Sequence, residues 1–233
     1  MSFISKLEYK YGKYAIPNLN IYICIVHIIG LLIQMTSPFF YYQYLSLDSQ
    51  ALMSGQIWRV FTFLFYPPSG GSFILISALI IYVYYSLSTS LIYVWGNFKF
   101  NLYFLIGILG HVLACVILGL FKINAIISPS YLMFSIFIAY SFTFGDSLFL
   151  LFFFIPIKAK YLALFEIALY IYMFIGSGFA TRISIVASLL NLIIFFYLLY
   201  KDKYRKFSNF LLSIKVEANK LVNDIKRLFT GRR

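Results

Sequence analysis

Apolar residues dominate this chain in long runs, and shorter polar segments separate the runs. A bilayer core about 30 Å thick is crossed by a helix of about 20 apolar residues. Six runs approach or reach that length, so the sequence predicts six membrane-spanning helices. Their expected limits are residues 19–40, 72–95, 100–121, 125–144, 161–175 and 183–200.

Two segments depart from this regular pattern. Residues 148–157 are apolar but too few to cross the bilayer. The fifth run is short and contains Glu166, the one acidic residue inside a predicted span. Ionisable residues are costly inside a membrane and suggest function. Glu166 is either a protonated or hydrogen-bonded carboxyl within the bundle, or a polar contact for a client helix that enters beside the fifth span.

The pattern divides the chain into an N-terminal segment (1–18), a membrane domain (19–200) and a tail (201–233). From Phe207 the apolar positions of the tail recur alternately every four and three residues, which is one stripe of a helix. Basic residues occupy its other faces. We expect a basic amphipathic helix on the anionic cytoplasmic surface. A coiled-coil contact or a docking site for a soluble partner is the alternative.

Composition supports the membrane assignment, with 62% hydrophobic and 11% charged residues. Soluble domains carry about 25% charged residues, and disordered chains are poor in aromatic residues. The two cysteines, Cys24 and Cys115, lie in different runs, so neither a disulfide framework nor a thiolate metal site is expected. We expect no cofactor or metal.

Charge predicts the orientation, because cytoplasmic loops carry an excess of Lys and Arg. Six spans with a cytoplasmic N-terminus place 16 of the 19 basic residues on the cytoplasmic side, together with both chain ends. The net charge of +12 is therefore no nucleic-acid signature. The charged start runs into a full-length span, so we expect an anchor rather than a cleavable signal peptide.

Three motifs occur in order at the ends of the predicted spans. Gln56, Trp58 and Arg59 precede the second span, Trp95-Gly96-x-x-Lys99-Phe100 joins the second and third, and an apolar segment at 151–160 follows the fourth. This series resembles the rhomboid-like superfamily, which includes rhomboid intramembrane proteases and the Derlins. The resemblance covers about residues 37–200, and it implies a rhomboid-like six-helix membrane bundle.

The first-loop residues also have a physical interpretation of their own. Trp58 suits a membrane interface, and the guanidinium of Arg59 can hydrogen-bond lipid phosphates or unpaired loop carbonyls. The plainer alternative is that both merely anchor the second span. Helix-breaking residues at 66–71 (Tyr-Pro-Pro-Ser-Gly-Gly) end any helix there. The sequence therefore predicts a first loop partly embedded in the outer leaflet.

The resemblance implies a serine nucleophile on the fourth span, a histidine base on the sixth and oxyanion donors on the second, since a serine hydroxyl needs a base and the oxyanion needs donors. The nearest residue to the nucleophile is Ser130, in Ser128-Pro129-Ser130-Tyr131, without the expected glycines. Ser188 occupies the histidine position, and Ile76 and Ile80 occupy the oxyanion positions.

The two histidines, His27 and His111, belong to the first and third spans, and we expect both to be packing residues. Gly107 and Gly110 are expected to allow close helix packing. No lysine lies inside a predicted span to replace the missing base. The sequence thus predicts a member of the superfamily without protease chemistry.

The overall prediction is an all-α integral membrane protein, a Derlin-like pseudoprotease that binds transmembrane or misfolded membrane-protein clients and assists their quality control or handover for degradation. Expected partners are the lipid bilayer, transmembrane clients and an ATP-driven protease or unfoldase. Candidate client contacts are the polar residues Glu166, Ser184, Ser188 and Asn191, for which helix packing is the commoner role. The alternative is a diverged rhomboid serine protease that uses Ser130. The resemblance implies the plasma membrane in a bacterium and the endoplasmic reticulum in a eukaryote.

Overall fold

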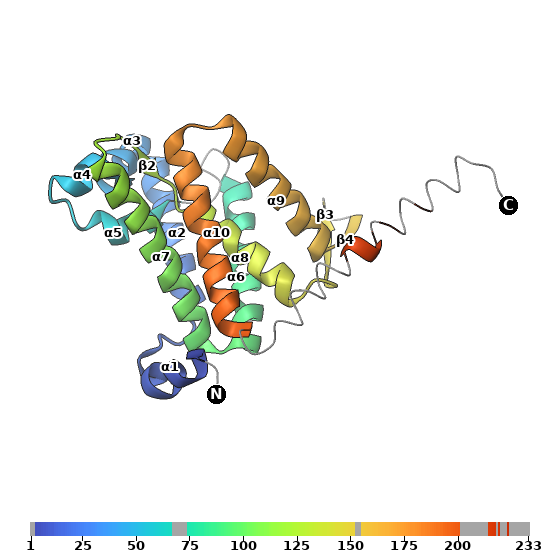
Figure 1. The fold of residues 1–233 in the computed structure, drawn as a ribbon. Helices are drawn as coiled ribbons and strands as arrows, with labels where there is room; N and C mark the ends of the chain where they lie inside the picture. The colour runs from blue at the N-terminus through green and yellow to red at the C-terminus, as the bar shows by residue number, and fades with distance from the viewer. Residues whose placement is uncertain are drawn as a thin grey trace.

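The computed structural model describes residues 3–66, 74–151, 155–200, 214–217, 219 and 223. They form a mostly helical molecule (Figure 1). Among them, five helices are long and apolar enough to cross a membrane: α2 (Leu19–Thr36), α6 (Ile74–Trp95), α7 (Asn97–Leu120), α9 (Ala159–Gly176) and α10 (Phe179–Tyr200). The fourth predicted run contains α8 (Ser130–Thr143), which is apolar but has only 14 residues.

Most of the long helices run between two ends of the molecule, whereas α9 slopes sideways toward β4 (Figure 1). One end, which we call the α1 end, carries α1 (Phe3–Tyr11) and η1 (Gly12–Tyr14). The other, the first-loop end, carries α3 (Pro38–Phe40), α4 (Ser49–Met53) and α5 (Arg59–Thr62). The N-terminal segment is folded onto the bundle: Ile4 is fully buried, and Glu8 forms an ion pair with Lys99, with Oε2 3.2 Å from Nζ.

The core lies where α6, α7, α8 and α10 meet. Its centre is aromatic: the ring of Phe195 lies 4.8 Å from that of Trp95 and 5.0 Å from that of Tyr103, between centroids. A Cβ at Gly107 would lie 2.2 Å from Cδ1 of Leu132 and 2.9 Å from Nδ2 of Asn191, so side chains of α8 and α10 fill the space beside this glycine. Gly107 therefore serves the close packing that the sequence predicts.

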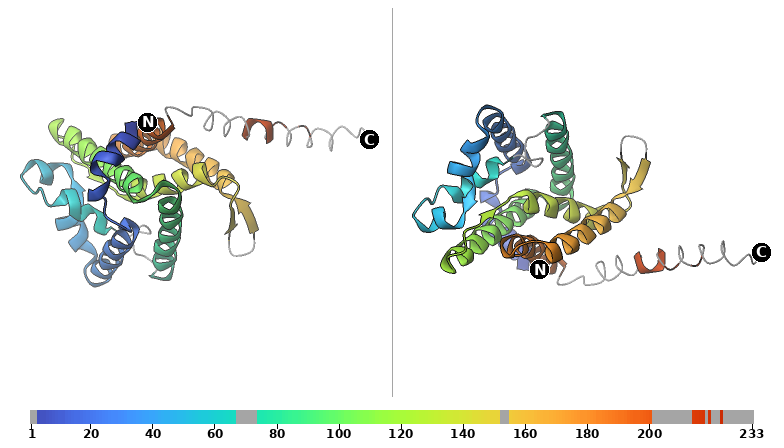
Figure 2. Two further views of the ribbon diagram at one scale, coloured as in Figure 1. Left: turned by 90° about the horizontal axis from the view of Figure 1, so that it is seen from below. Right: turned by 90° about the horizontal axis from the view of Figure 1, so that it is seen from above.

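Two short antiparallel sheets interrupt the helices, and the all-helical prediction misses them. β1 (Leu47–Asp48) pairs with β2 (Ile126–Ile127), and β3 (Leu148–Leu151) pairs with β4 (Ile155–Lys158). The fourth helix was expected from residue 125 but begins at Ser130, because the chain before it pairs with the first loop. The apolar segment too short to span forms β3 and β4, which project sideways from the helices (Figure 2).

Part of the first loop packs against α2 several residues before that helix ends. It contains a π-helical turn, η2 (Tyr41–Leu45), and a 3-10 turn, η3 (Phe63–Phe65). A Cβ at Gly30 would lie 1.3 Å from the carbonyl oxygen of Phe65, so η3 lies directly against this part of α2. Gly30 precedes the end of the helix by six residues, or about 9 Å at about 1.5 Å per residue. The embedding of the first loop in the outer leaflet stays a prediction.

Two predicted features fall largely outside the described residues. Of the helix-breaking segment, residues 67–71 are not described. Of the basic tail, only residues 214–217, 219 and 223 are described, and these are helical. The amphipathic tail helix thus stays a prediction over most of its length.

Candidate functional site

Arg59 holds the first loop together from the inside. Its side chain is buried, with 3% of the residue exposed. Nε donates to Oε1 of Gln56 at 2.8 Å, Nη1 donates to the carbonyl oxygen of Ser46 at 2.7 Å, and Nη2 donates to that of Gln43. A buried guanidinium is stable only where its donors find acceptors. The sequence leaves lipid phosphates and loop carbonyls as possible partners of this guanidinium. In the structure it contacts the loop carbonyls.

The residues around Arg59 tie the same loop to itself. Nε1 of Trp58 donates to the carbonyl oxygen of Tyr44 at 3.1 Å while half of the residue stays exposed. Oγ1 of Thr62 donates to the carbonyl oxygen of Leu45 at 3.0 Å. The motif after α6 has a matching structural role: Trp95 packs in the core and Gly96 turns the chain with a φ of 83°. Both motifs therefore shape the framework around the bundle interior.

Ser130, the residue nearest to the nucleophile position, is hydrogen-bonded to Ser128. Oγ of Ser128 donates to Oγ of Ser130 at 3.0 Å and accepts from the backbone N–H of Ser130 at 3.2 Å. These contacts lie at the entry to α8, which begins at Ser130. No histidine, lysine or carboxylate contacts either serine among the hydrogen bonds of the described residues. A serine without a base is a poor nucleophile.

The position of the missing histidine is close to this turn, but it holds a hydroxyl with a backbone partner. Oγ of Ser188, on α10, donates to the carbonyl oxygen of Tyr131 at 2.7 Å. The hydroxyl of Tyr170, on α9, donates to the same oxygen at 3.4 Å. Ser184 bonds within its own helix, to the carbonyl oxygen of Ala180 at 3.0 Å. Three helices thus meet at Tyr131 through structural hydrogen bonds.

The remaining catalytic positions are also without suitable groups. Ile76 is half exposed on the outer face of α6, and Ile80 is partly buried in the core, so neither supplies an oxyanion donor. His27 and His111 are buried elsewhere: Nε2 of His27 lies 3.4 Å from Sδ of Met133, and Nδ1 of His111 lies 2.8 Å from the carbonyl oxygen of Gly107. Both histidines are packed, as the sequence predicts.

The bundle interior contains a set of polar groups, which we call the interior polar cluster: Tyr84, Tyr103, Ser135, Glu166 and Tyr170. Glu166 interacts electrostatically with all three tyrosines, which come from α6, α7 and α9. The hydroxyl of Tyr103 donates to Oγ of Ser135 at 2.7 Å. Buried Oε2 of Glu166 has no hydrogen-bond partner among the described residues. The carboxyl therefore faces the bundle with unused hydrogen-bonding capacity.

A second group of unpaired polar atoms lies between α7 and α10. Asn191 is 2% exposed, and both of its side-chain polar atoms lack partners among the described residues. Its Nδ2 lies over Gly107, 2.9 Å from where a Cβ would be. Nε2 of buried His111 also lacks a described partner. Buried polar groups are normally hydrogen-bonded, so these atoms have unused hydrogen-bonding capacity.

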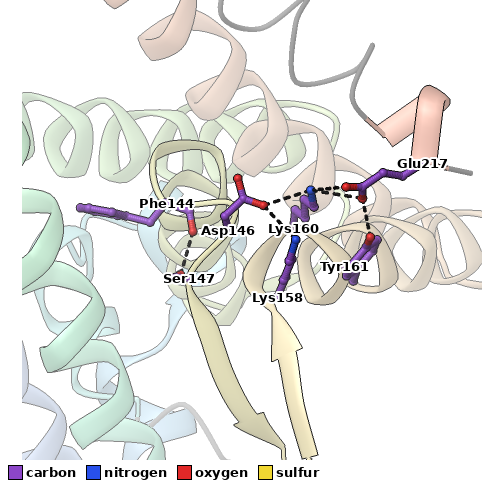
Figure 3. A network of polar contacts seen from close by, with 7 residues as sticks. All are labelled: Phe144, Asp146, Ser147, Lys158, Lys160, Tyr161 and Glu217. Carbon is purple, nitrogen blue, oxygen red and sulfur yellow. Dashed lines mark hydrogen bonds and ion pairs between the residues drawn. The ribbon is translucent and has the colours of Figure 1, made fainter.

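A third polar network joins the tail to the start of α9 (Figure 3). Buried Lys160 lies between two carboxylates, with Nζ 3.1 Å from Oδ1 of Asp146 and 3.2 Å from Oε2 of Glu217. Lys158 adds a second contact to Asp146 at 3.4 Å, and the hydroxyl of Tyr161 donates to Glu217. We call these five residues the ionic cluster. Among the described residues, this cluster connects the tail to the membrane domain.

Sequence reasoning finds some of these residues and misses others. The sequence singles out Arg59, Glu166, Ser188 and Asn191. The tyrosines that interact electrostatically with Glu166 in the structure are not among the residues that the sequence singles out. A tyrosine in an apolar run resembles an ordinary packing residue, so no sequence signal marks it. Among the described residues, no three His, Cys, Asp or Glu side chains converge as metal ligands.

Comparisons with protein-family models, with curated proteins and with solved structures return no match. The described helices define a class, a protein with several apolar helices of membrane-spanning length.

Proposed function

We propose that this chain is a rhomboid-like pseudoprotease that binds transmembrane segments of membrane-protein clients and assists their quality control or handover for degradation. The observation that carries the proposal is Glu166, a carboxyl in a spanning helix with a buried oxygen that lacks a described partner. Such a group is costly in a membrane and gains from a polar partner on a client helix. The order and spacing of the three motifs support the rhomboid-like assignment.

The exposure of α9 supports entry of the client beside this helix. Most of its large apolar side chains are exposed, and its buried residues are Ala159, Lys160, Ala163 and Tyr170. Phe165, next to Glu166, is 63% exposed. A client helix that packs on this surface lies beside Glu166, a residue of intermediate exposure. Helix association in lipid depends on such packing and on interhelical hydrogen bonds.

The contacts of the serines support binding without cleavage. Ser128 and Ser130 contact each other, and Ser188 contacts a backbone carbonyl. Serine chemistry needs a base and oxyanion donors, and the described contacts of these side chains supply neither. Labelling by a fluorophosphonate probe that Ser130→Ala abolishes would contradict this part of the proposal.

We further propose that the α1 end and both chain termini face the cytoplasm. Lys6, Lys10, Lys13 and Lys99 lie at that end, and ten further basic residues follow Tyr200 in the sequence. Arg59, Lys122 and Arg182 flank the first-loop end, and the difference supports this orientation by the positive-inside rule. In this orientation the basic tail is available to recruit an ATP-driven protease or unfoldase. The membrane is that of a bacterial cell or of the endoplasmic reticulum.

Binding of defined transmembrane peptides tests the proposal. The full chain in nanodiscs is titrated with a labelled leucine-rich transmembrane peptide and with the same peptide carrying one central Asn, and affinity is measured by energy transfer. We expect the Asn peptide to bind about three- to tenfold more tightly, because one interhelical hydrogen bond contributes about 0.6–1.5 kcal/mol.

Glu166→Leu is expected to remove this preference while leaving the affinity for the all-leucine peptide unchanged. Ser86→Leu, on the exposed face of α6, is the matched control and should retain it. Equal affinity of the wild-type chain for both peptides would overturn the proposal. A preference that survives Glu166→Leu would remove Glu166 from it.

A further inference from the structure

An apolar groove lies between α2 and α7 near the α1 end. Its volume is about 400 Å³. The wall is formed by residues of α1, η1, the chain between η1 and α2, α2, η3 and α7: Tyr11, Tyr14, Ala15, Ile16, Leu19, Tyr22, Ile23, Val26, Leu64, Asn101, Leu102, Phe104, Leu105 and Ile108. The wall runs from Leu19 to Val26 on α2, which is about 10 Å along the helix axis. We call it the α2–α7 groove.

The groove offers apolar contacts almost exclusively. Asn101 is the one amide in its wall, and that amide is already used: Oδ1 accepts from the backbone N–H of Ile16 at 3.0 Å, while Nδ2 donates to the carbonyl oxygens of Ile16 at 2.9 Å and Asn97 at 2.8 Å. These bonds also fix the chain between η1 and α2 against α7. The groove is therefore preformed, and its walls match an apolar occupant.

The mouth of the groove carries positive charge next to two of its aromatic wall residues. Nζ of Lys10 lies 5.1 Å from the ring centroid of Tyr11, and Nζ of Lys13 lies 5.0 Å from that of Tyr14. Both lysines are exposed, and neither forms an ion pair among the described residues. Tyrosine and lysine side chains in this arrangement are typical of the headgroup level of a bilayer.

From this combination we infer that the α2–α7 groove binds one anionic phospholipid, with part of an acyl chain in the groove and the phosphate between Lys10 and Lys13. A short groove of about 10 Å does not accommodate a client helix, which needs about 30 Å to cross the bilayer core. The charge at the mouth therefore favours an anionic lipid.

Lipid retention tests this inference with the full chain. The protein is purified in mild detergent with equal amounts of phosphatidylglycerol and phosphatidylcholine, and native mass spectrometry measures which lipid stays bound. We expect one phosphatidylglycerol to be retained preferentially, by about a factor of five for each lysine near the phosphate. The preference should weaken as salt screens the two charges.

Two variants separate the headgroup from the chain. Lys10→Gln combined with Lys13→Gln should abolish the preference for phosphatidylglycerol, whereas Lys122→Gln at the first-loop end should retain it. Leu105→Trp, which fills the groove, should lower retention of both lipids. Leu113→Trp, at an exposed position of α7 outside the groove, should leave retention unchanged.

Equal retention of the two lipids by the wild-type chain would overturn the inference. So would a preference that survives both lysine substitutions, or retention that Leu105→Trp leaves unchanged. Dimers that Leu105→Trp dissociates would identify a second copy as the occupant instead. Client binding through Glu166 is independent of these results, because the groove and the interior polar cluster share no residue.

Discussion

Arg59 is the residue on which the conformation of the first loop depends most directly. Its guanidinium satisfies acceptors from Gln43, Ser46 and Gln56 inside the loop. Removing one partner of a buried hydrogen-bonded charge leaves the other groups desolvated and unpaired. The stability lost when Arg59 is removed is therefore larger than the net stabilisation that its hydrogen bonds contribute.

Arg59→Met is expected to lower the free energy of unfolding by about 3 kcal/mol, because it leaves loop carbonyls without donors. Thermal unfolding in one detergent measures the change. Arg182→Met is the matched control: Arg182 donates from the surface to the carbonyl oxygen of Ile175 at 3.0 Å, so its loss should have little effect. Equal destabilisation by the two substitutions would contradict the role assigned to Arg59.

Single residues also show how far sequence reasoning reaches. A glycine beside a histidine in an apolar run predicts close packing, and Gly107 serves that purpose. The unpaired amide of Asn191 is different, because its lack of partners depends on what three helices place around it. The spacing along one helix shows on which face of that helix a residue lies. It does not show which residues of the neighbouring helices pack against that face.

At the scale of elements, the long helices are the predictable part of the fold. Hydrophobic runs place α2, α6, α7, α9 and α10 within a few residues of their observed limits. The start of α8 was not predictable, because β2 pairs with β1 from a distant loop and Ser49 accepts the backbone N–H of Ala125 at 3.0 Å. Apolar composition does not distinguish such a strand from a helical turn.

The ionic cluster joins two elements, the tail and the start of α9. Hydrogen bonds from Lys160, followed by its charge, hold the pKa of Asp146 below its usual range. Hydrogen bonds from Tyr161 and Lys160 do the same for the pKa of Glu217. A carboxylate with a lowered pKa stabilises the folded contact above its ordinary pKa, and that stabilisation is lost as the pH falls through the lowered value.

The tail contact is therefore expected to persist at neutral pH and to release in acid, below the ordinary carboxyl range. A nitroxide at Val216→Cys, in a background with Cys24 and Cys115 replaced by Ala, reports the change by electron paramagnetic resonance. The label should be restricted at neutral pH and mobile in acid. In Glu217→Gln it should be mobile throughout, and mobility that does not respond to pH would contradict the contact.

At the scale of the whole molecule, charge and polarity have separate locations. The basic residues lie mainly toward the α1 end and in the tail, whereas the interior polar cluster comes from α6, α7, α8 and α9. The first is the basis of the proposed orientation in the membrane, and the second is the basis of the proposed client site. The long apolar helices follow from the hydrophobic runs alone, but the site depends on which helices meet.

The most direct measurement is photo-crosslinking from two lipid-exposed positions of similar exposure, Phe165 on α9 and Leu113 on α7, which are 63% and 61% exposed. Each is replaced by a photoreactive phenylalanine in the full chain, and the products are identified from native membranes. We predict that position 165 captures intact transmembrane proteins in clear excess over position 113. Equal capture at the two positions, or capture of cleaved fragments only, would contradict a pseudoprotease that binds clients beside α9.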